Sequence, residues 1–357
     1  MSTAVRAVAT AAAVNMHYLV GISGGLDSTL AAATLLDAGH TVTGAVLQFS
    51  DHTDLAAARL AAEELGVPLH EIDCRDDFEK IVKGYFAQSY AAGRTPNPCV
   101  VCNRYLKIQK LCDLAQSLGC DKVITGHYAD IVCAENGRYA VKQSENRKKD
   151  QSYMLWGLTQ EQLSLLAFPL RNADKESLRQ TAIERSFSSA GAKESMDICF
   201  LPDGNYADFV EGVVGKSLPG SFVDKNGKVL GQHKGIIHYT VGQRKGLGIA
   251  LGQPAFVSKI DPVQNTVTLV FAGEEYADSM TIGDLNFQSI AKTEDFESEE
   301  LFVKIRYAAQ PVPCKVRIEG AVATVTFTSP ARAVTPGQSA VFYDKNGIIA
   351  FGGFIEK

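Results

Sequence analysis

The string Ser23-Gly24-Gly25-Leu26-Asp27-Ser28 places two glycines, two hydroxyls and a carboxylate within six residues of a 357-residue chain. It follows a short apolar run, 18–22, and opens a segment rich in alanine and leucine. Glycines let the backbone approach a ligand closely, and the N–H groups of such a turn at a helix N-terminus suit a phosphate or pyrophosphate. Asp27 is suited either to orient the loop or to hold Mg²⁺. The string is neither a Walker A loop nor the Gly-x-Gly-x-x-Gly dinucleotide fingerprint.

A second reactive group is the Cys-x-x-Cys pair Cys99 and Cys102, which follows a loop stiffened by two prolines. Such a pair is able to bind a metal or cluster, to form a redox disulfide, or to lower the pKa of one thiol so that it attacks as a thiolate. A four-cysteine zinc site would need a second Cys-x-x-Cys, which the chain lacks. A third thiol, Cys199, follows 97 residues after Cys102 (199 minus 102). The other five cysteines are expected to be core packing residues: Cys74, Cys112, Cys120, Cys133 and Cys314.

Hydrophobic periodicity indicates the elements that position these residues. The expected strands are 18–22, 41–49, 69–73 and 122–125, and the expected helices are 26–36 and 55–65. Strands that alternate with helices indicate an α/β fold with a doubly wound parallel sheet. Ligands bind such sheets beyond the carboxyl ends of the strands, where the loops 23–28 and 125–127 are expected to lie.

The rest of the chain predicts two further domains. Glycines and turns spread through 203–252 indicate a small linker domain. Alternation of apolar and polar residues in 302–316 and 321–328, with a hairpin turn at 344–347, predicts a C-terminal antiparallel β-barrel. The expected boundaries are 1–15 for an N-terminal extension, 16–203 for the catalytic domain with the Gly-rich loop, 204–275 for the linker domain and 276–357 for the barrel.

Composition excludes several classes of protein. With 46% hydrophobic and 21% charged residues the chain is close to globular averages, which argues against disorder and coiled coil. A membrane helix needs an uncharged apolar run of roughly 18 to 20 residues, and the chain has none. Because the net charge is -5, any nucleic-acid contact must come from local basic patches.

Further motifs follow one another along the chain. They are Thr95-Pro96-Asn97-Pro98, Thr125-Gly126-His127-Tyr128-Ala129, Lys149-Asp150-Gln151-Ser152-Tyr153, Asp197-Ile198-Cys199-Phe200, the stretch 239–248, Arg306-Tyr307 and the stretch 335–343. Together with the Gly-rich string, this ordered set resembles the tRNA-specific 2-thiouridylases (MnmA family) of the PP-loop ATP pyrophosphatase superfamily. The resemblance extends over essentially the whole chain from about Met16.

The resemblance implies an ATP-dependent sulfurtransferase that acts in two stages. ATP, with Mg²⁺, would adenylate the C2 oxygen of the wobble uridine of tRNA, and sulfur would then displace AMP, a better leaving group than oxygen. In the family's scheme Cys199 carries the sulfur as a persulfide, Cys102 is the nucleophile, and the two then form a disulfide. The implied ATP-binding residues are Gly21, Ile22, Ser23, Gly24, Gly25, Leu26, Asp27, Ser28, Leu47 and Gly126.

The resemblance also implies contacts with tRNA. Asn97, Pro98 and Cys99 would surround the target base. The other implied tRNA contacts are His127, Lys149, Asp150, Gln151, Arg244, Lys245, Arg306, Tyr307 and Gln338. Arginine and lysine would meet phosphates and the tyrosine would stack.

Two features depart from the family pattern. Many members carry aspartate at the position of Cys99, and the thiol here gives three cysteines, 99, 102 and 199, that are able to hold a [4Fe-4S] cluster by three irons and leave the fourth open to hydrosulfide. The persulfide and cluster routes therefore both stay open. The loop 50–54 is also shorter than is usual in the family, which puts tRNA or sulfur-donor contacts there in question.

Two other functions fit part of the pattern. One is a PP-loop enzyme that adenylates a different substrate, with structural thiols; the three matched cysteines and the expected barrel argue against it. The other is a non-catalytic tRNA-binding sulfur carrier, against which the intact Gly-rich string argues. The expected partners are tRNA and a sulfur-donor protein or sulfide, with no membrane, and the expected location is the cytoplasm.

Overall fold

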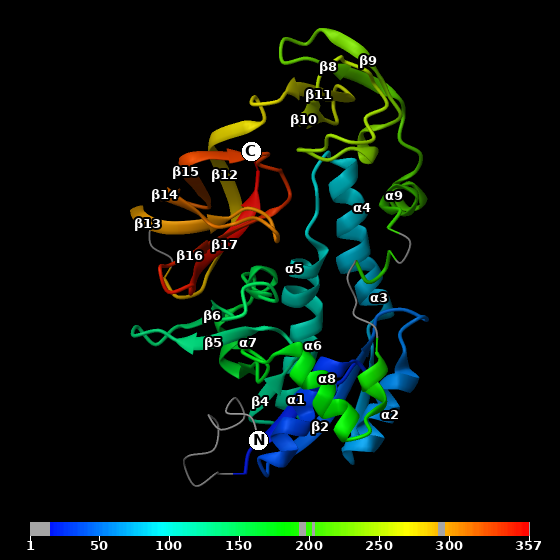
Figure 1. Ribbon diagram of the computed structural model, residues 1–357, viewed down its shortest axis with the longest axis vertical. Helices are drawn as coiled ribbons and strands as arrows, with labels where there is room; N and C mark the ends of the chain where they lie inside the picture. Colours follow the sequence, from blue (N-terminus) through cyan, green and yellow to red (C-terminus); the bar gives the residue numbers. More distant parts are fainter. Residues whose placement is uncertain (1–14, 193–197, 202–203, 292–296, 357) are drawn as a thin grey trace. The chain divides into compact units, whose positions relative to one another are not determined.

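The computed structural model describes residues 15–192, 198–201, 204–291 and 297–356 (Figure 1). The chain forms two compact units. The first unit comprises Met1–Glu79, Val100–Met196 and Gly347–Ile349, and the second comprises Lys80–Cys99, Asp197–Asn346 and Ala350–Lys357. The chain therefore leaves the first unit after Glu79 and returns to it at Val100.

The first unit is built on a five-stranded sheet with the order β3-β2-β1-β4-β7. The strands are β1 His17–Gly21, β2 Thr41–Gln48, β3 Leu69–Asp73, β4 Lys122–Ile124 and β7 Leu166–Ala167. Every neighbouring pair is parallel, which confirms the predicted doubly wound sheet. The chain runs from β1 outward to β3 and resumes on the other side of β1, so the strand order reverses between β1 and β4. This is the place where such sheets bind ligands.

Helix α1 (Leu26–Asp37) is rich in alanine because it is covered on two sides. Ala31 packs in one cluster with the strand residue Val20, and Leu30 packs in another with Ala182 and Phe187. Ala182 lies on α8 (Lys175–Glu184), and the small side chains between the two helices allow them to contact each other closely. The packing brings α8 to α1.

Four helices lie between β3 and β4, and periodicity predicts none of them. They are α3 Arg75–Phe78, α4 Gly84–Ala91, α5 Pro98–Cys102 and α6 Ile108–Ser117, with π-helical turns at Glu79–Lys83 and Asn103–Lys107. A π-helical turn displaces backbone carbonyls from their usual donors. The carbonyl of Arg104 accepts instead from the buried Gln162 amide at 2.9 Å. The π-helical turn Asn103–Lys107 thus connects α5, which ends at Cys102, directly to α6.

The remaining elements of the first unit complete its surface. They are α2 Leu55–Leu65, the antiparallel pair β5 Ala129–Cys133 and β6 Tyr139–Gln143, and α7 Gln160–Leu165. Helix α2 has the predicted bounds and begins at an Asp54 cap that accepts from Ala57 N–H. Helix α7 begins with a capping box, in which Thr159 and Gln162 satisfy each other's backbone N–H groups.

The linker part of the second unit is a four-stranded sheet of order β10-β11-β8-β9 with one helix. The elements are α9 Tyr206–Val214, β8 Gly220–Val223, β9 Val229–His233, β10 Ala255–Asp261 and β11 Thr266–Phe271. Its core includes Phe222, Val257 and Val267, and Phe86 of α4 belongs to the same cluster. The segment Lys80–Cys99 is therefore held by the linker core.

The C-terminal part of the second unit is a closed barrel of order β12-β15-β14-β13-β16-β17, as predicted. The strands are β12 Tyr276–Phe287, β13 Glu297–Lys304, β14 Val312–Glu319, β15 Val322–Arg332, β16 Ser339–Tyr343 and β17 Ile349–Ile355. Burial alternates along β14 because one face points into the barrel. The single alternating run expected at 302–316 is wrong in one respect, since a turn divides it between β13 and β14. Among the described residues, no helix is both long and apolar enough to cross a membrane.

Candidate functional site

The Gly-rich loop connects β1 to α1 and is held by its own hydroxyls. Ser28 Oγ lies 3.2 Å from Ser23 Oγ, accepts from Ser23 N–H at 3.2 Å and donates to Gly25 O at 3.0 Å. Gly25 is the N-cap of α1, and no side chain caps this helix. The N–H groups of the first turn of α1 are therefore left to an anion, which the partial positive charge of the helix N-terminus favours.

Two glycines allow backbone segments to close around this loop. Gly24 has φ +77°, and a Cβ there would lie 2.6 Å from the carbonyl carbon of Ala57 on α2. Gly126 follows β4, and a Cβ there would lie 3.0 Å from Cβ of Asp27. The loops after β1 and β4 thus meet in direct contact, which confirms that the two predicted loops lie at one edge of the sheet.

Asp27 is bound from two sides by residues of the first unit. The Tyr128 hydroxyl donates to Asp27 Oδ1 at 2.7 Å, and Lys175 Nζ lies 3.5 Å from Asp27 Oδ2. The two side chains of the ion pair are only 20% and 28% exposed. Sequence reasoning missed Lys175, since nothing local marks it apart from the Asp174 cap that begins α8. Its cation adjoins the place where the Gly-rich loop would receive phosphate.

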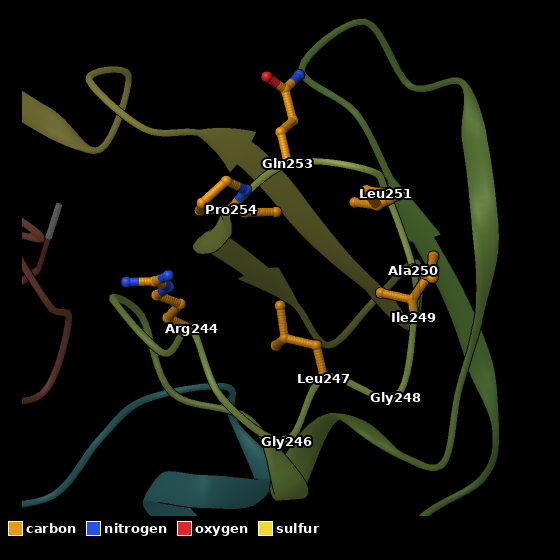
Figure 2. A pocket seen from close by; sticks show the side chains of 10 residues that line it. Arg244, Gly246, Leu247, Gly248, Ile249, Ala250, Leu251, Gln253 and Pro254 are labelled. Atoms are coloured by element: carbon orange, nitrogen blue, oxygen red, sulfur yellow. The ribbon is translucent and has the colours of Figure 1, made fainter.

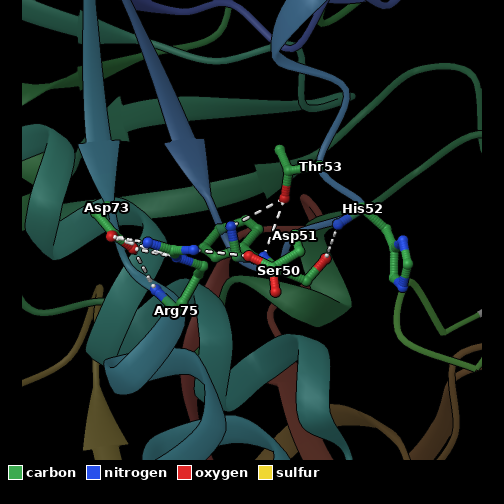
Figure 3. Close-up of polar contacts among 7 residues, drawn as sticks. Ser50, Asp51, His52, Thr53, Asp73 and Arg75 are labelled. Atoms are coloured by element: carbon green, nitrogen blue, oxygen red, sulfur yellow. Dashed lines mark hydrogen bonds and ion pairs between the residues drawn. The ribbon is translucent and has the colours of Figure 1, made fainter.

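The carboxyl end of β2 lies at the same edge of the sheet. Leu47, an expected ATP contact through its backbone, is buried in β2 beside the last residue of the strand. The following short loop is ordered by Thr53, whose hydroxyl accepts from the N–H groups of Phe49 and Ser50 (Figure 3). Arg75 donates to both Asp51 and Asp73 there, and its hydrogen bonds lower the pKa of Asp73 to about 2. This loop is thus a compact turn.

The three thiols expected to act on sulfur differ in exposure. Cys99 and Cys102 lie on α5, where Cys99 is exposed and Cys102 is buried. Cys199 is exposed and follows the undescribed residues 193–197. Among the described residues none of the eight cysteines is in a disulfide, and no group of three or more His, Cys, Asp or Glu side chains is placed to hold a metal ion.

Four of the five other cysteines are core residues, as predicted. Burial raises the pKa of Cys74 to about 11 and the pKa values of Cys112 and Cys314 to about 12, and it also raises the pKa of Cys120. Thiols of this kind stay protonated and unreactive at neutral pH. The expectation is wrong for Cys133, which is exposed at the end of β5, because a two-stranded sheet does not cover it.

Family models match almost all of the chain. Residues 16–203 match the tRNA methyl transferase HUP domain, 207–270 the tRNA methyl transferase PRC-barrel domain, and 277–355 the aminomethyltransferase beta-barrel domain. A protein of Acetivibrio thermocellus named tRNA-specific 2-thiouridylase MnmA is 45% identical over 95% of this chain and 98% of its own length. Proteins of the same name from Lachnoclostridium phytofermentans and Carboxydothermus hydrogenoformans are each 42% identical, over 95% of this chain and 99% and 97% of their own lengths.

The chain belongs to the tRNA-specific 2-thiouridylase (MnmA) family. It is therefore a sulfurtransferase that thiolates uridine in tRNA, and its HUP domain is the ATP-using PP-loop domain of that family. The remaining expected site residues are the expected tRNA contacts.

The basic loop after β6 is exposed but is organised by Asp150. Arg147 and Lys148 are exposed, whereas Asp150 is buried. Its Oδ1 accepts from Ser144 N–H at 2.9 Å and its Oδ2 from the Ser152 hydroxyl at 2.8 Å. The neighbouring Gln151 accepts from Tyr128 N–H at 3.0 Å through its side chain. Of the two expected tRNA contacts, Asp150 thus faces its own loop, and Gln151 binds the segment after β4 at Tyr128.

His127 is a neutral imidazole in this structure. Part of the residue is exposed, yet burial of the ring, with a smaller effect of Lys107, lowers the pKa of His127 to about 3. Its Nδ1 lies 2.7 Å from the Thr125 hydroxyl, and its ring contacts Phe168 edge-on with centroids 5.6 Å apart. At neutral pH it is suited to hydrogen bonds with a base or ribose, since it carries no charge for phosphate.

Of the expected tRNA contacts in the barrel, Tyr307 is exposed and Arg306 is hydrogen-bonded within the protein. Tyr307 is 42% exposed, and Lys304 Nζ lies 5.4 Å from the centre of its ring. Arg306 instead donates through Nη2 to Ala333 O at 2.5 Å and to Thr335 Oγ1 at 2.7 Å. Of these residues only Tyr307 presents its side chain openly to solvent.

The linker thiouridylase motif 239–248 ends at a surface hollow of about 490 Å³. Arg244 stands at its edge, and Leu247, Ile249, Leu251 and Pro254 provide apolar walls (Figure 2). Arg244 and Lys245 are both exposed. The motif therefore offers two cations beside an apolar surface.

Proposed function

We propose that the loops at the carboxyl ends of β1, β2 and β4 bind ATP and use it to adenylate the C2 oxygen of the wobble uridine of tRNA. The observation that carries this proposal is the direct packing of Gly126 on Asp27 beside the uncapped N-terminus of α1. Backbone N–H groups of 23–28 would bind phosphate, and Leu47 and Gly126 would bind the adenosine part through their backbones. Lys175 adds a cation for the departing pyrophosphate.

The Mg²⁺ that accompanies ATP fits this loop. Mg²⁺ is usually held by one or two carboxylates and by the substrate's phosphates, and Asp27 supplies one partly exposed carboxylate. Mg²⁺ would neutralise phosphate charge. Asp27 would turn from Lys175 toward the ion, which would leave Lys175 free for the phosphates.

Sulfur transfer is proposed to follow the persulfide route. Cys199 is exposed and accessible to a sulfur donor, whereas Cys102 is buried beyond the exposed Cys99 on α5. The Cys102 thiolate would attack Sγ of the Cys199 persulfide, forming a Cys102–Cys199 disulfide and releasing hydrosulfide. Hydrosulfide would add at C2 of the adenylated uridine, and AMP would leave with the former oxygen. A reductant of the dithiol class would then restore both thiols.

The cluster route stays the alternative, because Cys99, Cys102 and Cys199 are donors of the right type. Three thiolates suit a [4Fe-4S] cluster. The cluster is therefore the alternative that iron analysis has to decide, and no step of the proposal passes through it.

The tRNA is proposed to meet exposed and half-buried groups on several elements. Lys149, Arg244, Lys245 and Tyr307 would contact the backbone or stack, His127 would hydrogen bond, and Cys99 would face the target base beside Asn97 and Pro98. Asp150, Gln151 and Arg306 would act by shaping the surfaces on which these residues stand. We further propose the division at 203/204 and 275/276 into catalytic, linker and barrel domains, and the cytoplasm, where tRNA and ATP occur, as the location.

Cysteine variants test the sulfur route. We expect Cys102→Ser and Cys199→Ser each to lower 2-thiouridine formation at least about 100-fold, since each removes a nucleophile. Cys133→Ser, an exposed thiol outside the scheme, should retain wild-type activity. Iron and acid-labile sulfide are measured in the same anaerobically purified proteins.

Either sulfur route gives a distinct result. Active protein without iron supports the persulfide. About four irons per chain, lost in Cys99→Ala along with sulfide-driven thiolation, would refute it in favour of the cluster. Thiolation that survives in Cys102→Ser would also refute it.

A further inference from the structure

The loop that carries Asn97 and leads into the Cys99 helix is docked on a turn of the barrel. Both segments belong to the second unit. Thr95 N–H donates to Pro336 O at 2.8 Å. The side-chain amide of Gln338 donates to Thr95 O and Pro96 O, each at 3.1 Å. Three hydrogen bonds thus join two residues of the barrel turn, Pro336 and Gln338, to the loop immediately before Asn97.

The docking continues into buried positions. Asn97 is 6% exposed and its Nδ2 lies 3.4 Å from Oγ of Ser339, which is fully buried. Gly337 has φ +90°, and a Cβ there would lie 2.8 Å from Thr95 O and 2.9 Å from Cβ of Arg94. A residue other than glycine at 337 would therefore push the two segments apart. The contact depends on glycine as well as on the amide of Gln338.

The other end of the same barrel turn contacts the linker motif. Thr335 Oγ1 accepts from Arg306 at 2.7 Å, and Arg306 Nη2 also lies 3.3 Å from Val241 O. A Cβ on Gly242 would lie 2.8 Å from Cβ of Ala333. The turn 333–339 is thus held by Arg306 and the linker motif at one end and holds the loop 95–97 at the other.

We propose that the barrel turn 333–339 sets the position of the loop that presents Asn97 and Cys99, with Gln338 as the positioning residue. The inference rests on the proposed function of that loop and deepens it. Glutamine has both a donor and an acceptor. The Gln338 side-chain N–H groups donate to the carbonyl oxygens of Thr95 and Pro96. Its Oε1 has no partner among the described residues and stays available to a donor group on RNA.

The proposal assigns a distinct signature to residue 338. Gln338→Glu keeps the size and the acceptor but replaces the donor with a charge that faces two carbonyl oxygens. Gln338→Met removes both the donor and the acceptor without adding charge, and Gly337→Ala breaks the contact from the other side. Each should detach the loop while the barrel stays closed around its own core. Gln264→Glu, the same exchange on the exposed β10–β11 turn, is the matched control.

Two measurements test it. The first is hydrogen exchange of the Thr95 amide without tRNA, which should accelerate in the three variants and not in Gln264→Glu. The second is single-turnover 2-thiouridine formation at saturating tRNA, which should fall on the order of 10- to 100-fold, the effect of a misplaced reacting group. The Kd for tRNA should change less than about threefold in Gln338→Glu and Gly337→Ala, since both variants keep the acceptor at residue 338 and the other contacts.

The outcomes separate this inference from the proposed function. Wild-type rates and unchanged Thr95 exchange in Gln338→Met and Gly337→Ala would overturn the positioning role. A wild-type protein that forms no 2-thiouridine would overturn the proposed function. The hydrogen exchange of the Thr95 amide would still test whether the barrel turn holds the loop 95–97. If Gln338→Glu melts far below wild type, the uncharged Gln338→Met decides.

Discussion

Asp27 joins three parts of the first unit at one carboxylate. It belongs to the Gly-rich loop, accepts from Tyr128 after β4 and pairs with Lys175 on α8. Because the pair is largely shielded from water, its electrostatic interaction is stronger than that of an exposed pair. The cation is therefore positioned before the nucleotide arrives, which is what stabilisation of a charged transition state requires.

Replacing Lys175 tests this role. Lys175→Ala should lower tRNA-dependent AMP formation about 100-fold, because a preorganised charge at the phosphates is lost. Lys110→Ala removes a more exposed ion pair with Asp77 in the same unit and should leave AMP formation unchanged. Equal AMP formation by Lys175→Ala and wild type would exclude the role.

His127 gives a prediction for pH. Burial holds its pKa at about 3, below the ordinary value of 6.5, so between these values the unfolded chain binds a proton that the folded protein does not. The free energy of unfolding should therefore rise with pH from about 3 to about 6.5, and the contribution of His127 is lost as the pH falls. Melting temperatures of wild type and His127→Gln across this range measure it.

The difference between the two proteins isolates His127, since His233 and His238 also have lowered pKa values and stay in both. The melting temperature of His127→Gln should fall less than that of wild type on acidification. His52→Gln, at an exposed position, should follow wild type. Parallel curves for wild type and His127→Gln would contradict a buried neutral imidazole.

At the level of residues, the sequence predicts the functional residues that belong to a contiguous motif. The string 23–28 is contiguous, and its position between a strand and a helix predicts a phosphate-binding loop. Lys175 lies 148 residues after Asp27 (175 minus 27), and only the packing of α8 on α1 brings the two together. Asp150 is expected from the sequence to contact tRNA, but its carboxylate is buried and accepts from Ser144 N–H and the Ser152 hydroxyl.

At the level of elements, the approach of α2 to the Gly-rich loop depends on Gly24. Gly24→Ala should lower ATP affinity and destabilise the protein by about 1 to 3 kcal/mol, because it adds both a strained φ and a clash with Ala57. Gly39→Ala is the matched control, since Gly39 has φ +83° but open space around its Cβ position. Calorimetry of ATP binding and thermal unfolding compare the two.

The control should share the backbone strain and keep ATP affinity. If both variants lose ATP affinity equally, contact with α2 does not shape the loop. If neither does, the loop tolerates displacement from α2 and the geometric argument for Gly24 is wrong.

Elements with an internal pattern are predictable, and those defined by distant partners are not. Helix α2 has the expected bounds because its apolar residues repeat with helical spacing, and strand β3 also has the expected bounds. The segment 74–121 has no single period, since α4 packs on the linker core whereas α6 packs on β1 and β4. The turn within 302–316 is hidden because alternation continues through it.

At the level of the whole molecule, sequence predicts the order of domains better than their interleaving. The parallel sheet, the linker sheet and the barrel occur in the expected order. The segment Lys80–Cys99 belongs to the second unit because Phe86 packs against Phe200 and Phe209, with ring centroids 5.3 and 5.9 Å apart. Such aromatic contacts join residues more than a hundred positions apart, which no local pattern reveals.

The central claim is that one ATP is split to AMP for each wobble uridine that receives sulfur. The most direct test incubates the anaerobic wild-type protein with unmodified tRNA, ATP, Mg²⁺, sulfide and a dithiol, and counts AMP and 2-thiouridine in the same samples. We expect AMP and 2-thiouridine to form in a ratio of about one, and neither to form with Asp27→Asn. Formation of 2-thiouridine without AMP, or of AMP with no 2-thiouridine on any tRNA, would contradict the account.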